Sequence, residues 1–201
     1  MSELVIQPTT TAQWHALVSD AEHAAGYSLG EELESYLVFL LMRFTRKPQM
    51  LSRIMALDYL KQTNGSRNER GQKLKDVGDH CLLFSGLFPQ HAEKRMVRVS
   101  YFVKLGRSAY QQVFEDLHHH DTLYSHLSKD FVTLMDILQT MRDIQHDDNH
   151  NTHLSPIHAF DLWHDTGSKH AYKTIKSMTS GQPVKPSFAD LDDDNPLLIR
   201  H

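Results

Sequence analysis

The chain has 201 residues and a formal net charge of −4, with 40% hydrophobic and 23% charged residues. This composition is ordinary for a soluble globular protein, and the chain is long enough to form one domain with a sizeable core. One cysteine, Cys81, excludes an internal disulfide and a zinc site with several cysteine ligands.

The N-terminus lacks the basic start and long apolar run of a signal peptide. The most apolar window, residues 36–44, is much shorter than the roughly 18 to 20 residues of a membrane span. We therefore predict a cytoplasmic protein that does not cross a membrane.

Charge is distributed unevenly along the chain. Residues 1–41 carry a net charge of −6, residues 42–113 carry +9, and residues 115–165 carry −8. Two interpretations stay open. Oppositely charged helices could face one another inside the folded domain, or the basic block could form a surface for an acidic partner.

The first part of the chain predicts an N-terminal arm, residues 1–10, followed by helices. Thr10 or Thr11 caps a helix that runs to about Ala24, and a capping box, Ser28 to Glu31, starts the next one. That second helix is apolar on most sides and ends at Pro48. A third helix is predicted from its apolar residues, which are Leu51, Ile54, Met55, Leu57 and Leu60.

The central part, residues 66–117, predicts two apolar helices separated by a break at Pro89. A second capping box, residues 66–69, opens the first helix, and the second runs from Tyr101 to Leu117. Glycines inside these helices each cost close to 1 kcal/mol relative to alanine and mark close approach of a neighbouring helix. We therefore predict one tight crossing of these two helices, at Gly78, Gly86 and Gly106.

The last part predicts one long helix from Asp121 to about Gln145 and a polar loop over residues 146–153. Two short helices, residues 155–163 and 168–178, follow. Residues 179–201 form an acidic tail that contains proline. No segment alternates like a strand, so we predict an all-α fold. It is a single compact helical bundle of about seven helices over residues 11–178, with a flexible C-terminal tail.

Two segments of the central part, VGDHCLLFSGLFP (77–89) and YFVKLGRSAY (101–110), resemble an uncharacterised bacterial all-helical family. The shared features are a Gly-Asp pair, a Ser-Gly-Phe-Phe-Pro-like stop and a Gly-x-x-Ala-Tyr segment after paired aromatics. Leu87 replaces the first aromatic residue of the stop. The resemblance implies one helical domain, and no established activity comes with it.

Metal binding is one hypothesis. Glu115-x-x-His118 and Asp161-x-x-His164 each place an acid and a histidine three residues apart, as in the di-iron sites of four-helix bundles. Further carboxylates could come from Glu34, Asp76 or Asp79. The histidine-rich stretches also offer ligands for Fe, Zn or Ni, at His118, His119, His120, His126, His146, Asp147, Asp148, His150 and His153. Those stretches lack a recognised ligand spacing.

A buried polar cluster is a second hypothesis, because Asp79 and His80 lie in an otherwise apolar segment. A buried carboxylate needs partners, and we expect a base such as Arg107, Arg98 or Lys104, or a set of backbone donors. The cluster could be an ion pair that joins two core helices or the floor of a pocket with a shifted pKa. Cys81 has no activating neighbour beyond His80, so we expect an inert thiol.

A basic surface is the third hypothesis, and its members are Arg67, Arg70, Lys73, Lys94, Arg95 and Arg98. No nucleic-acid-binding motif accompanies them and acidic segments flank them, which favours a protein partner over a nucleic acid. We predict a non-enzymatic adaptor or regulator that binds a protein and could self-associate. The alternatives are a metal-dependent, di-iron-like oxidase or oxygenase and a phosphate or nucleic-acid binder that uses residues 67–107.

Overall fold

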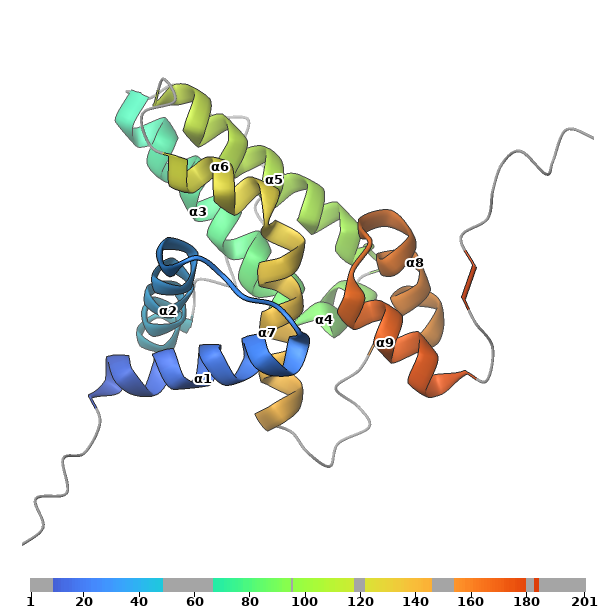
Figure 1. Cartoon of the computed structure of the whole chain (residues 1–201). Coiled ribbons are helices and arrows are strands. Elements are labelled where there is room, and N and C mark those ends of the chain that lie inside the picture. Colours follow the sequence, from blue (N-terminus) through green and yellow to red (C-terminus); the bar gives the residue numbers. More distant parts are fainter. Residues whose placement is uncertain are drawn as a thin grey trace, which may run out of the picture.

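The computed structural model describes residues 9–48, 67–94, 96–117, 122–145, 154–179 and 183–184, which form nine helices and no strand (Figure 1). The all-α prediction is confirmed, and the number of helices is close to the seven expected. The helices are α1 (Thr10–Ala25), α2 (Glu31–Arg46), α3 (Arg67–Leu87), α4 (Pro89–Lys94), α5 (Val99–Asp116), α6 (Thr122–Lys129), α7 (Phe131–Gln145), α8 (Pro156–Thr166) and α9 (Lys169–Met178).

Some predicted features lie outside the described residues. They are most of the N-terminal arm, the third helix with Leu51 to Leu60, the second capping box at Ser66 and most of the acidic tail. In the part of the chain that the structure covers, no helix is long and apolar enough to cross a membrane.

The core forms where α3 and α5 lie side by side, with α7 packed across α3 (Figure 1). A Cβ atom added to Gly78 would lie 2.5 Å from the Tyr110 ring, and one added to Gly106 would lie 2.5 Å from the Phe131 ring. Only glycine permits such close approach. The predicted crossing of α3 and α5 is confirmed for Gly78 and for Gly106, where an added Cβ would also lie 2.8 Å from Cys81 Cβ, but it was wrong for Gly86, where an added Cβ would lie 2.5 Å from Leu138 of α7.

Two predicted helix starts were wrong. Thr9, rather than Thr10 or Thr11, caps α1 through its hydroxyl, which accepts the amide of Ala12 at 3.2 Å. The capping box at Ser28 does not form, because α2 begins at Glu31 and its N-cap residue is Gly30, which has no side chain to bond the amides of the first turn. Three glutamates in the first turn of α2 provide favourable charge at the positive end of the helix dipole instead.

The predicted long helix from Asp121 to Gln145 was also wrong, because it is divided into α6 and α7 at Asp130. Next to the division, Arg107 on α5 donates from Nε to the Ser128 carbonyl at 3.0 Å, and the Ser128 hydroxyl donates to the Arg107 carbonyl at 3.0 Å. A contact with another helix therefore takes the Ser128 carbonyl, which a continuous helix would use internally.

The hairpin of α8 and α9 (Figure 1) packs on the rest of the fold through apolar residues, including Leu162 and Ile175, and through polar contacts. Asp136 on α7 is fully buried and accepts the Ser168 hydroxyl at 2.5 Å and the Lys169 amide at 2.9 Å. It also accepts the Tyr27 hydroxyl at 2.8 Å. A carboxylate at the N-terminus of α9 both satisfies free amides and stabilises the helix dipole.

Candidate functional site

Asp79 on α3 is one of the fully enclosed polar residues of the core, with 0% of its surface exposed. Its carboxylate accepts the Tyr36 hydroxyl at 2.5 Å and the Tyr110 hydroxyl at 2.8 Å, and it forms an ion pair with Arg43. Tyr36 and Arg43 are seven residues apart on α2, so they lie on the same face of that helix. The cluster of these four residues, which we call the Asp79 cluster, joins α2, α3 and α5.

The cation beside Asp79 is therefore not one of those expected. Arg107 is exposed and bonds the Ser128 carbonyl, so its assignment as a buried polar residue was wrong. Arg98 lies 3.6 Å from Asp161, and His80 is half-buried. Arg43 was missed because it lies 36 positions before Asp79, on a helix whose sequence is otherwise mostly apolar. The seven-residue spacing of Tyr36 and Arg43 is the signal that could have found it.

Burial raises the pKa of Asp79, while the charge of Arg43 and the hydroxyls of Tyr36 and Tyr110 act in the opposite direction. Burial also raises the pKa of Cys81 to about 12, so this thiol stays protonated and is a poor nucleophile. Two hydroxyl donors and a guanidinium already occupy the carboxylate of Asp79. This geometry is that of a structural connection between helices.

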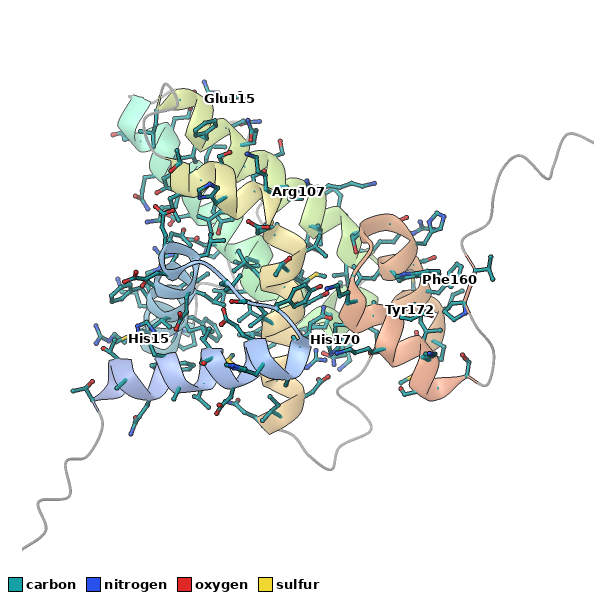
Figure 2. All side chains as sticks on the ribbon, viewed as in Figure 1. His15, Arg107, Glu115, Phe160, His170 and Tyr172 are labelled. Atoms are coloured by element: carbon teal, nitrogen blue, oxygen red, sulfur yellow. The ribbon has the colours of Figure 1, made fainter. Side chains whose placement is uncertain are left out.

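The proposed metal ligands do not come together. Ser100, near the start of α5, donates to Asp165 on α8 at 2.6 Å, whereas Glu115 lies near the other end of α5. Fifteen residues of helix separate Ser100 from Glu115, which corresponds to about 22 Å. Figure 2 accordingly shows Glu115 far from Phe160, the ring that stacks on His164.

The three described members of the proposed site have other partners instead. Glu115 accepts the side-chain amide of Gln111 at 3.1 Å, Asp161 pairs with Arg98, and His164 lies 3.3 Å from Asp165. His118 falls outside the described residues, as do His119, His120 and the stretch from His146 to His153. Where side chains are described, no group of three or more His, Cys, Asp or Glu residues could hold a metal ion. A di-iron site built from Glu115 and Asp161 is contradicted by their separation.

The proposed basic surface is divided between two ends of the molecule. Arg70 and Lys73 lie near the start of α3, whereas Lys94 and Arg98 follow its far end. The helix between Lys73 and Leu87 alone spans about 21 Å. The side chain of Arg67 and the whole of Arg95 lie outside the described residues.

Two arginines of this surface face acids of the 115–165 block. Arg70 lies 3.4 Å from Asp116, and Arg98 lies 3.6 Å from Asp161 and 3.9 Å from Asp165. In these contacts oppositely charged segments face one another inside the fold, which was the first interpretation of the uneven charge distribution. The basic residues thus form two separate patches, each in contact with acidic side chains.

The patch after α4 contains an unusual backbone. The Val97 amide donates to the Ala92 carbonyl at 3.0 Å, and Met96 between them has φ 55°. This is the Schellman arrangement that ends many helices, in which the left-handed position is usually glycine. The end of α1 has the same bond, from the Tyr27 amide to the Glu22 carbonyl at 3.0 Å, and there the left-handed residue is Gly26 with φ 72°.

Met96 is also the most exposed large apolar side chain among the described residues, at 96%. Lys94 and Arg98 are exposed on either side of it in the sequence, and Tyr101 on the first turn of α5 is 43% exposed. We call these four residues the α4–α5 turn surface. Sequence reasoning treated the segment as a break between helices and missed Met96, because nothing local identifies a left-handed methionine.

Comparisons with protein-family models, with curated proteins and with solved structures give no match. The resemblance of residues 77–89 and 101–110 to a bacterial helical family therefore assigns no role to any residue.

Proposed function

We propose that the protein is a non-enzymatic adaptor or regulatory protein of the cytoplasm. It binds an acidic protein segment that also has an apolar side chain, through the α4–α5 turn surface. The observation that carries this proposal is the fully exposed Met96 in a left-handed backbone. A strained residue at the surface is a reason to look for a function there.

The backbone conformation of Met96 is unfavourable, and among the described residues the side chain gains almost no burial that would compensate for it. A left-handed non-glycine residue costs about 1 to 2 kcal/mol, because its Cβ crowds the following carbonyl. A side chain that is 96% exposed buries almost no apolar surface in return. The α1 end shows that glycine serves the same bond, so the methionine is not needed for the turn. A contact outside the chain accounts for it.

The chemistry of the surface defines the partner. Methionine is flexible and polarisable, and it fills irregular apolar pockets at binding surfaces. Lys94 adds exposed positive charge beside it, which favours a segment with carboxylates and speeds its association, whereas the charge of Arg98 is partly neutralised by Asp161 and Asp165. Tyr101 adds an aromatic ring of the type enriched at protein interfaces.

A metal analysis separates this proposal from the oxidase alternative. Untagged protein purified without a nickel column should contain no stoichiometric metal. About two iron or manganese ions per chain would overturn the non-enzymatic assignment.

A binding experiment tests the surface itself. A partner captured from the source cell is titrated against the wild type, against Met96→Ser and against the control Arg70→Gln/Lys73→Gln at the far end of α3. Truncating a central apolar contact weakens binding by at least about tenfold. We expect that loss for M96S and less than about a twofold change for the control. Equal affinity of M96S and the wild type would refute the proposal.

A further inference from the structure

A second surface, separate from the α4–α5 turn, lies on α9. Three exposed lysines, Lys169, Lys173 and Lys176, occur at spacings of four and three residues, so they share one face of this helix. We call them the lysine row. The opposite face, with Ala171, Thr174 and Ile175, is buried against the rest of the fold.

Acidic side chains contact the start of α9, where Asp136 accepts the Lys169 amide at 2.9 Å and Asp143 lies 2.8 Å from His170 Nε2. Helix α9 contains neither Asp nor Glu. Among the described residues, no ion pair links Lys173 or Lys176 to a carboxylate. Lys169 places its ammonium 4.3 Å from the centroid of the Tyr27 ring, which orients one end of the row. An acidic occupant would complete this surface.

The chain carries such an occupant just beyond the helix. Asp190, Asp192, Asp193 and Asp194 lie in a stretch, residues 187–196, that contains no Lys or Arg. Twelve residues lead from Met178 to Asp190, and an extended chain of that length reaches about 40 Å. Helix α9 has ten residues and is therefore only about 15 Å long. The acidic stretch can fold back over the whole row.

The spacings of the two sets of charges also correspond. An extended segment places every second side chain on one side, so Asp190, Asp192 and Asp194 would be about 6.7 Å apart. Lys169 and Lys173 are separated by about 6 Å along the helix, and Lys173 and Lys176 by about 4.5 Å.

We infer that residues 190–194 bind the lysine row of α9 in the same chain. Proximity favours this occupant, because a tethered segment has a high effective concentration at a nearby surface. Other basic groups are in reach, but Arg98 already faces Asp161 and Asp165. The interaction is electrostatic and exposed, so salt weakens it.

Carbodiimide cross-linking of the full chain tests the contact, because it joins a carboxylate directly to an amine. Digestion and mass spectrometry of the monomer should recover Asp190–Asp194 joined to Lys169, Lys173 or Lys176. Cross-links of the acidic stretch to lysines outside α9 would overturn the inference. Cross-links found only between two chains would also overturn it, because the lysine row would then bind a second copy of the protein.

A second readout measures protection of the tail. Cleavage at Asp190–Asp194 by an Asp-specific protease should be about tenfold faster in Lys169→Glu/Lys173→Glu/Lys176→Glu than in the wild type, since three exposed pairs are lost. The matched control, Lys47→Glu/Lys104→Glu/Lys129→Glu, changes three other exposed lysines and should cleave at the wild-type rate. Equal rates in the two triple variants would refute the contact, whatever the outcome for Met96.

Discussion

The ends of α1 and α4 share one backbone arrangement and fill its left-handed position differently. Gly26 ends α1 and Met96 ends α4, and in both cases the following amide bonds the carbonyl five residues earlier. Glycine adopts this conformation without a steric penalty, and methionine does not. The turn after α4 therefore keeps a side chain that the turn itself does not require.

The core around Asp79 differs from this turn, because its buried carboxylate and its closest helix contact are both satisfied inside the fold, although the buried Arg43 Nε makes no hydrogen bond among the described residues. The buried carboxylate has three donors, and Gly78 leaves the space that the Tyr110 ring occupies. A buried charge or a close contact that the fold itself satisfies has a structural role. An exposed residue in an unfavourable backbone conformation, which the fold does not require, indicates a contact with another molecule. The predictions below test both sides of that comparison.

The largest effect is expected from Asp79→Ala. The change leaves two tyrosine hydroxyls and the charge of Arg43 without their partner, so the free energy of unfolding should fall by about 3 to 5 kcal/mol. This is a large part of the roughly 5 to 15 kcal/mol that stabilises a domain. Chemical denaturation measures it, with Asp76→Ala as the control. Asp76 is half-buried on the same helix and accepts the side-chain amide of Gln72 at 3.1 Å. A similar loss in both variants would contradict a structural role for the Asp79 cluster.

A smaller loss is expected from Gly78→Ala. The new methyl group would lie 2.5 Å from the ring of Tyr110, which is fully buried and bonded to Asp79 and so cannot move away freely. Overpacking of this kind costs about 1 to 3 kcal/mol. In Gly71→Ala on the same helix, nothing lies within 4 Å of the new atom. That variant should gain up to about 1 kcal/mol from helix propensity. Thermal unfolding of both variants measures these changes in stability. A G78A variant more stable than the wild type would show that the helix crossing is loosely packed.

The smallest effect concerns pH. Because burial raises the pKa of Asp79 against the opposing effect of Arg43, the folded protein holds this proton more tightly than the unfolded chain does. Its stabilising contribution is present below the unfolded pKa of about 3.9 and falls as pH rises through the raised pKa. The unfolding free energy of the wild type minus that of Asp79→Asn should therefore decrease between about pH 4 and pH 7. An increase over that range would mean that the ion pair outweighs burial.

Sequence patterns predicted those parts of the fold that depend on neighbouring residues. The apolar runs of α3 and α5 and the glycines at 78 and 106 indicated the central crossing. The division at Asp130 was missed because it depends on Arg107 of another helix. Arg43 was missed as the partner of Asp79 for the same reason, since 36 positions separate them.

The candidate site was less predictable than the fold. Glu115 and Asp161 share a ligand-like spacing with their histidines, but spacing within a helix says nothing about where a second helix packs. Lys94 and Arg98 were identified as basic residues, yet the exposure of Met96 between them depends on how α4 ends. A left-handed position is predictable from sequence when glycine fills it, as at Gly26, and not when methionine does.

One variant, Met96→Gly, tests the central claim most directly, because stability and binding should change in opposite directions. Relief of the left-handed backbone should raise the free energy of unfolding by about 0.5 to 1 kcal/mol. Loss of the side chain should weaken binding of the captured partner by at least about tenfold. A variant that is more stable and binds as the wild type does would contradict the proposed function, and one that is less stable would contradict the strain on which it rests.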